Sequence, residues 1–304
     1  VGKFGPDTRS SIPKENITDS SATGSVTSTG DDVGGLVGYF RGTSITASSA
    51  SGTIESDGSR VGGLVGHLDD GSIMDSSAKE VTVNGSSRIG GLVGEFGKGG
   101  DSVGSLRGTI SNSSVTGGVD GTGDSVGGLV GYFQGTSVTT SSASGTVTNT
   151  GDQTGGLIGY AIGDISDSTA RVTVEGTTNT SAFVGWINGD VTGATVTGDV
   201  TGSSYVGGVV GYLFRSSDQN EITDATANGK TAGTDYVGGL LGGTGGSAPS
   251  PPTVLIKNAT ATGDVIATGD DVGGLVGELD LTGDTIINSA ATGDVTGASK
   301  TGGL

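Results

Sequence analysis

Short apolar runs recur along the chain, separated by stretches rich in glycine, serine and threonine. The most regular run reads Val-Gly-Gly-Leu-Val-Gly, and its central residue returns every 26 to 37 positions. That residue is apolar in every copy, namely Leu36, Leu64, Leu92, Leu129, Leu157, Phe183, Val209, Leu240, Leu275 and Leu304. Self-similarity at a period of roughly 20–50 residues indicates a repeat architecture, in which each unit packs on its neighbours.

A second run, Ile-x-x-Ser-Ser-Ala-x-Gly, lies between copies of the first and is clearest at residues 45–52 and 138–145. Its small central residue precedes the next motif leucine by 13 or 14 positions throughout. The distance from a leucine to the next small residue varies instead from 13 to 23 positions. One arc of the unit is therefore constant, and the other accepts insertions along one edge of the array. The longest insertions are expected at about residues 5–14, 97–106 and 242–252.

A single unit has too few apolar residues to fold alone, so the pattern predicts that equivalent strands stack one coil above another. We expect an all-β fold, a right-handed β-solenoid (parallel β-helix) of about ten coils with no significant helix. Leu36 should point inward and stack on Leu64 and Leu92. Gly34 and Gly35 should form a sharp corner, through a positive φ or a close backbone approach.

The whole chain is expected to be one repeat domain, spanning residues 1–304. Its first residues, Val-Gly-Lys-Phe-Gly, resemble the Val-Gly-Glu-Phe-Gly of residues 93–97, just after a motif leucine. The last residue, Leu304, is itself a motif leucine. Both ends thus cut through the same motif, which suggests an interior segment of a longer array.

Composition and charge narrow the function. Glycine accounts for 64 of 304 residues, but there is no Gly-X-Y period and only five prolines, so collagen is excluded. The net charge of −18 argues against nucleic acid and anionic membranes, both of which need a basic patch. No apolar stretch approaches the length of a membrane span. Cysteine is absent, which rules out disulfides and thiolate metal sites.

The repeating Gly-Leu-Val-Gly core resembles the GLUG-motif repeat family over nearly the whole chain. Members of that family are similar to parts of large secreted or surface-anchored adhesins and of bacterial IgA-cleaving metallopeptidases. The resemblance implies an extracellular accessory repeat, and it brings no catalytic site with it.

Paired carboxylates in the turns beside the glycine motif are candidate calcium ligands. Asp31 and Asp32 form one pair, and Asp270 and Asp271 another. Stacked turn carboxylates could share Ca²⁺ between coils, whereas the simpler interpretation is solvated turn aspartates. The calcium-binding β-roll nonapeptide is absent, and no other cofactor is expected.

An aromatic residue follows the glycine motif in many coils, at Tyr39, Tyr132, Tyr160, Trp186 and Tyr212. An outward file of aromatics could bind sugars or proteins, or it could simply stack from coil to coil and stabilise the wall. Glu95 and Glu278 interrupt the file, and His67 occupies the same slot.

The sequence offers little for catalysis, because His67 is the only histidine and neither a zinc-peptidase motif nor a serine triad can be assembled around it. We therefore expect a non-enzymatic, extracellular structural or adhesive module of a cell-surface or filament-forming protein. Its partners would be a protein or glycan ligand, or further copies stacked end to end. The alternative is an accessory repeat domain of a secreted carbohydrate-active enzyme or peptidase.

Overall fold

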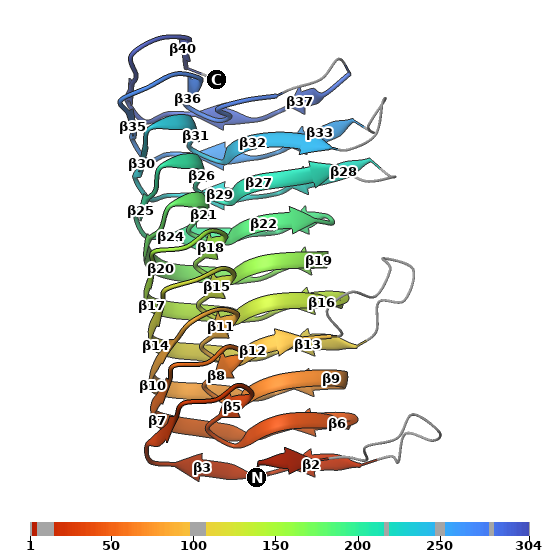
Figure 1. The fold of residues 1–304 in the computed structure, drawn as a ribbon. Helices are drawn as coiled ribbons and strands as arrows, with labels where there is room; N and C mark the ends of the chain where they lie inside the picture. The colour runs from red at the N-terminus through yellow and green to blue at the C-terminus, as the bar shows by residue number, and fades with distance from the viewer. Residues whose placement is uncertain are drawn as a thin grey trace.

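The chain is a stack of β-coils along one axis, with its two ends at opposite ends of the stack (Figure 1). The computed structural model describes residues 2–4, 15–97, 108–215, 219–246, 253–279 and 283–303, and every regular element within them is a β-strand. Each strand pairs in parallel with its equivalent in the next coil, which produces three sheets running the length of the stack. The predicted all-β solenoid of about ten coils is confirmed.

The first sheet, sheet A, has 15 strands: β1 (Lys3–Phe4), β2 (Asn16–Thr18), β6 (Val37–Thr46), β9 (Val65–Met74), β12 (Val93–Phe96), β13 (Thr109–Ser111), β16 (Val130–Thr139), β19 (Ile158–Ser166), β22 (Val184–Asn188), β23 (Val191–Thr192), β27 (Val210–Arg215), β28 (Asn220–Thr223), β32 (Leu241–Gly246), β33 (Val254–Lys257) and β37 (Thr285–Ile287).

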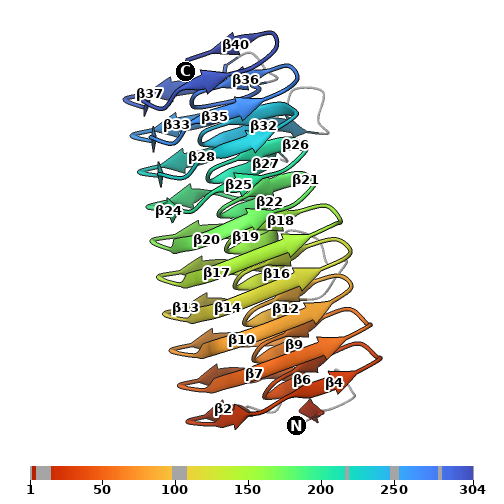
Figure 2. The ribbon, with the colours of Figure 1, turned by 90° about the vertical axis from the view of Figure 1, so that its left-hand side faces the viewer.

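Sheet B forms the wall that faces the viewer in Figure 2 and also has 15 strands: β3 (Ser21–Thr23), β4 (Val26–Ser28), β7 (Ser49–Ser56), β10 (Ser77–Gly85), β14 (Ser114–Gly121), β17 (Ser142–Asn149), β20 (Thr169–Glu175), β24 (Thr195–Thr197), β25 (Val200–Thr201), β29 (Thr226–Ala227), β30 (Thr231–Gly233), β34 (Thr260–Ala261), β35 (Val265–Ala267), β38 (Ala290–Ala291) and β39 (Val295–Thr296).

Sheet C has ten short strands within the described residues, each just before the central apolar residue of a motif: β5 (Val33–Gly34), β8 (Val61–Gly62), β11 (Ile89–Gly90), β15 (Val126–Gly127), β18 (Thr154–Gly155), β21 (Thr178–Ser181), β26 (Ser204–Gly207), β31 (Asp235–Gly238), β36 (Val272–Gly273) and β40 (Thr301–Gly302). No helix capable of crossing a membrane is found among the residues that the structure describes.

The motif leucines form the expected interior file. The backbone N–H of Leu36 donates to the carbonyl oxygen of Leu64 at 3.0 Å, and the N–H of Leu64 donates to that of Leu92 at 2.9 Å. Leu64 and Leu92 are fully buried, and Leu36 packs against the same core. Each buried leucine stabilises the stack by about 1.5–3 kcal/mol.

The motif glycines are needed for close backbone approach. A Cβ on Gly34 would lie 2.1 Å from the carbonyl oxygen of Val37, and one on Gly35 would lie 2.4 Å from that of Gly63 in the next coil. The left-handed backbone occurs just before the motif, where Asp32 has a φ of 57°. Gly34 and Gly35 are therefore needed because the backbone passes close to other backbone atoms, and not because they adopt a positive φ.

A buried ladder of serine hydroxyls lines the corner between sheets A and B. Ser48 is typical, since its Oγ donates to the carbonyl of Thr46 at 2.9 Å and accepts the backbone N–H of Ser20 at 3.3 Å. The same arrangement continues at Ser76, Ser113, Ser141 and Ser168, whereas the equivalent buried positions further along are Ala194, Ala225 and Ala259.

The predicted insertions fall mainly outside the described residues, which omit 5–14, 98–107 and 247–252. The start of the third insertion was placed too early. Residues 242–246 lie within β32, which pairs with β27 in sheet A. The glycines there continue the ladder of backbone hydrogen bonds with β27.

Candidate ligand-binding groove

Two files of side chains run next to each other along the outside of the stack. The turn file consists of the left-handed residue just before each sheet C motif: Asp32, Arg60, Arg88, Ser125, Gln153, Asn179, Tyr205, Tyr236, Asp271 and Lys300. The aromatic file lies seven residues later, on sheet A: Tyr39, His67, Glu95, Tyr132, Tyr160, Trp186, Tyr212 and Gly243.

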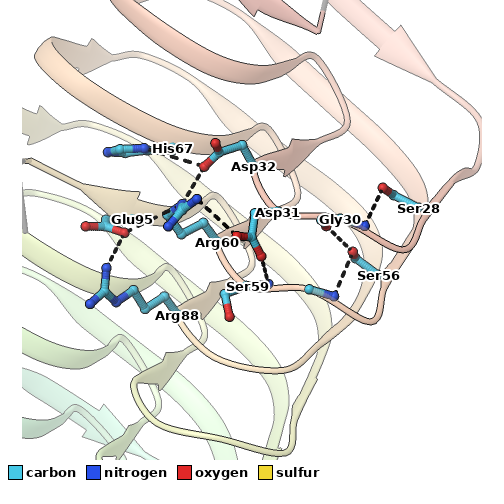
Figure 3. A network of polar contacts seen from close by, with 11 residues as sticks. Ser28, Gly30, Asp31, Asp32, Ser56, Ser59, Arg60, His67, Arg88 and Glu95 are labelled. Carbon is cyan, nitrogen blue, oxygen red and sulfur yellow. Dashed lines mark hydrogen bonds and ion pairs between the residues drawn. The ribbon is translucent and has the colours of Figure 1, made fainter.

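Alternating charges connect the two files in the early coils (Figure 3). Arg60 Nε donates to Asp32 Oδ1 at 2.5 Å, and Arg60 Nη2 donates to Asp31 Oδ2 at 3.3 Å. His67 Nδ1 lies 3.5 Å from the same Asp32 oxygen. The candidate calcium ligands Asp31 and Asp32 thus meet a guanidinium group from the next coil.

Glu95, which interrupts the aromatic file, holds the two arginines of the turn file in place. Its side chain is only 2% exposed, its Oε2 accepts a hydrogen bond from Arg88 Nη1 at 2.6 Å, and the same oxygen lies 3.9 Å from Arg60 Nε. From the sequence, Glu95 was expected only to interrupt the aromatic file, and neither arginine was predicted to belong to a site. The available signal was that both arginines directly precede a Val/Ile-Gly-Gly motif.

These contacts fix the protonation states around the groove. Burial acts to raise the pKa of Asp32, but hydrogen bonds from His67 and Arg60 outweigh it, and the pKa lies below its ordinary value. The hydrogen bond to Asp32 raises the pKa of Arg60. Burial raises the pKa of the Tyr160 hydroxyl to about 12, so this hydroxyl remains a donor at neutral pH.

The aromatic file is a stack in its middle section. The ring centroids of Tyr132 and Tyr160 are 4.9 Å apart, those of Tyr160 and Trp186 are 4.1 Å apart, and both pairs are nearly parallel. The guanidinium of Arg88 covers Tyr132 at 5.0 Å from the ring centroid. Ring faces are therefore occupied by neighbours, and the rings offer mainly edges and hydroxyls to a ligand.

The ends of the predicted contact face depart from a straight file. Tyr39 makes an edge contact with His67, with centroids 5.1 Å apart. Trp186 stacks on Phe214 with centroids 5.3 Å apart, while Tyr212 meets Tyr205 edge-on at 5.0 Å. The five predicted residues thus lie on one face but do not form a single uninterrupted platform.

A hollow of about 550 Å³ lies over these two files, and we call it the polar groove. Five successive coils line it, with Asp31, Ser59, Arg60, Ser87, Arg88, Asp124, Ser125, Tyr132, Gln153 and Tyr160. At about 4.8 Å per coil, four coil steps correspond to a length of about 19 Å along the axis. A second hollow of about 490 Å³ shares Asp31 and is bordered by Lys3 and Tyr39.

The other predicted carboxylate pair lies near the opposite end of the stack. Asp271 accepts a hydrogen bond from Lys300 Nζ at 3.2 Å, and Asp270 accepts one from the Ser299 hydroxyl. The structure does not bring this pair near Asp31 and Asp32. Across the described ranges, three or more potential ligands do not gather at any point. Calcium binding at either pair stays a prediction.

Comparison with known proteins identifies the repeat. The family model described as the GLUG motif matches residues 57–84, 122–148 and 150–175. These stretches are GLUG repeats. Each GLUG repeat contributes side chains to the polar groove, for example Arg60, Tyr132 and Tyr160. No curated protein and no solved structure matches the chain.

Proposed function

We propose that the chain is a non-enzymatic, extracellular module with a structural and adhesive role in a cell-surface or filament-forming protein. The observation that carries the proposal is the polar groove, an outward binding surface built on a rigid stack of GLUG repeats. The net charge of −18 supports solubility in an exposed position and disfavours nucleic acid as a partner.

The placement of acidic groups favours binding over hydrolysis. Asp31 and Asp124 are the two carboxylates in the groove, and they belong to coils three steps apart. That separation is about 14 Å along the axis, whereas the paired carboxyls of glycosidases are about 5–9.5 Å apart. Asp32 has a lowered pKa, which makes it a poor general acid at neutral pH.

A surface-accessibility experiment tests the location. An antibody raised against the purified chain should label intact cells of the source organism as strongly as it labels broken cells. Beads coated with the chain should also stay attached to surfaces from which uncoated beads are washed off. Labelling confined to broken cells would contradict an extracellular role.

A turnover assay separates this proposal from the alternative of an accessory domain in a carbohydrate-active enzyme or peptidase. Binding of glycans without release of products supports the adhesive module. Cleavage of a glycan or peptide that disappears in Asp31→Ala or Asp32→Ala would instead assign chemistry to this face.

A further inference from the structure

We infer that the polar groove binds a neutral polysaccharide, which lies along the solenoid axis across successive coils. This inference rests on the proposed adhesive function and gives that function a ligand class. It is carried by the composition of the groove, by the rigidity of its side chains and by its direction along the stack.

The groove can form hydrogen bonds of both kinds along its whole length. All ten described residues that line it are polar or tyrosine. Arg60 and Arg88 are donors, Asp31 and Asp124 are acceptors, and the remaining hydroxyl and amide groups can act as either. A lipid or an apolar peptide would gain little by burial there, whereas a chain of sugar hydroxyls matches donors and acceptors in alternation.

The groove has no surplus positive charge, which disfavours an acidic ligand. Two arginines face two aspartates in the lining. Both guanidinium groups are already paired internally, Arg60 with Asp32 at 2.5 Å and Arg88 with Glu95 at 2.6 Å. An acidic polysaccharide would therefore meet no surplus positive charge locally, and a chain of net charge −18 would repel it.

The lining side chains are held in position before any ligand binds. Ser125 Oγ donates to Gln153 Oε1 at 2.8 Å, and Asp31 Oδ1 accepts the backbone N–H of Ser59 at 2.8 Å. Tyr132 is fixed between Arg88 and Tyr160. Because these groups lose little freedom on binding, hydrogen bonds to hydroxyls can contribute to affinity without a large entropic cost.

A peptide strand is a poorer fit for this surface. Peptides usually bind to sheets by pairing with an open strand edge. In the coils beneath the groove, the sheet C strands β8, β11 and β15 each have a paired neighbour on both sides. A polysaccharide does not require an open edge, and its extended shape suits a hollow that crosses five coils.

Titration calorimetry of the 304-residue chain tests the inference. The ligands are three soluble neutral polysaccharides (a β-glucan, a mannan and a galactan) and one acidic polysaccharide, alginate. We expect at least one neutral chain to bind and alginate not to bind. Binding of none of the three neutral polysaccharides, or of alginate alone, would overturn the inference.

A blocking variant locates the site. Ser59→Tyr fills the groove and should raise the dissociation constant by about tenfold or more, which corresponds to about 1.4 kcal/mol. Ser204→Tyr is the matched control, because Ser204 also directly precedes a turn-file residue but does not line the groove. Equal weakening by both variants would place binding elsewhere and refute the assignment.

A milder pair of variants covers the case in which Ser59→Tyr fails to fold. Tyr160→Phe removes one groove hydroxyl and keeps the ring stack, so it should weaken binding severalfold, whereas Tyr236→Phe, outside the groove, should not. Unchanged affinity in Tyr160→Phe would count against the site. If coated beads adhere although none of the neutral polysaccharides binds, the groove inference fails while the adhesive proposal stands.

Discussion

The coils that contain Ser48 to Ser168 and the coils that contain Ala194 to Ala259 share one backbone course but differ at the same buried corner. In the first group a serine hydroxyl accepts an N–H from the preceding coil, as Ser76 Oγ does from Ser48 at 3.2 Å. In the second group a methyl group takes that place, and it cannot accept a hydrogen bond. The repeat therefore fixes the backbone ladder, while corner chemistry varies from coil to coil.

The outer surfaces of the two groups differ as well. The serine coils carry the charged network of Arg60, Arg88 and Glu95, which forms one end of the polar groove. In the alanine coils two turn-file residues are aromatic, and Tyr205 stacks on Tyr236 at 4.6 Å between centroids. Stacking aromatics and pairing charges are two ways to join neighbouring turns, and the charged version also supplies lining residues of the polar groove.

The largest expected effect comes from disrupting the core within the serine coils. Leu129 is fully buried, and Leu129→Arg would place an unpaired charge in the core of a serine coil. We expect the neighbouring coils to lose more than about 3 kcal/mol of local stability. Because each coil contacts mainly its neighbours, hydrogen exchange in the alanine coils should stay slow. Uniform loss of protection throughout the stack would show instead that both groups unfold as one unit.

The sequence was sufficient to predict the stack because its strongest signal is periodic. Leu36, Leu64 and Leu92 could be aligned by their spacing alone. Residues that align in the repeat occupy the same position in successive coils, so they lie above one another in the stack. The glycines beside them were equally informative, since only a residue without a Cβ fits against the next coil's carbonyl.

The groove was harder to predict because its contacts join residues of different coils and of different types. Arg60 pairs with Asp32 one coil away, yet the two occupy equivalent positions and carry opposite charges. A repeat alignment shows such positions as variable. Glu95 was misleading for the same reason, because its role depends on Arg88, which lies seven residues earlier at a position that holds seven residue types over ten coils.

The next largest effect is expected from a substitution that makes the corner of a serine coil resemble that of an alanine coil. Ser113→Ala removes the hydroxyl that accepts the N–H of Ser76 at 3.3 Å and leaves that buried donor without this partner. Such a loss costs about 1–3 kcal/mol. The local opening free energy by hydrogen exchange should fall by about that amount at Ser76. Ser114→Ala, in the half-exposed neighbouring position, should change it by less than about 0.5 kcal/mol.

A smaller effect concerns the acid sensitivity of the charged turn file. The pKa of Asp32 is lowered in the folded chain, so its ionised form stabilises the fold above its ordinary pKa of 3.8, and this contribution is lost as the pH falls through the lowered value. Asp32→Asn should therefore destabilise the early coils by about 1 kcal/mol at pH 7. In strong acid the two proteins should converge.

The equivalent turn residue in a late coil provides the comparison. Asp271 pairs with Lys300, whose side chain is 69% exposed, so solvent screens this contact. Chemical denaturation followed between pH 7 and pH 2 should show a pH-dependent difference for Asp32→Asn and a weaker one for Asp271→Asn. Equal pH profiles for the two variants would mean that the charged network adds nothing beyond an exposed ion pair.

The smallest effect is expected from the reverse substitution, which places a serine at the corner of an alanine coil. Ala225→Ser adds a hydroxyl at a fully buried corner where the serine coils bond both to the carbonyl two residues earlier and to an N–H from the preceding coil. Here those groups belong to Thr223 and Ala194, and satisfying them should stabilise the coil by about 0.5 kcal/mol. Thermal unfolding and hydrogen exchange at Ala194 measure the change. Destabilisation would mean that the alanine corners have closed around the methyl group, and the two kinds of coil would then differ in backbone spacing as well as in chemistry.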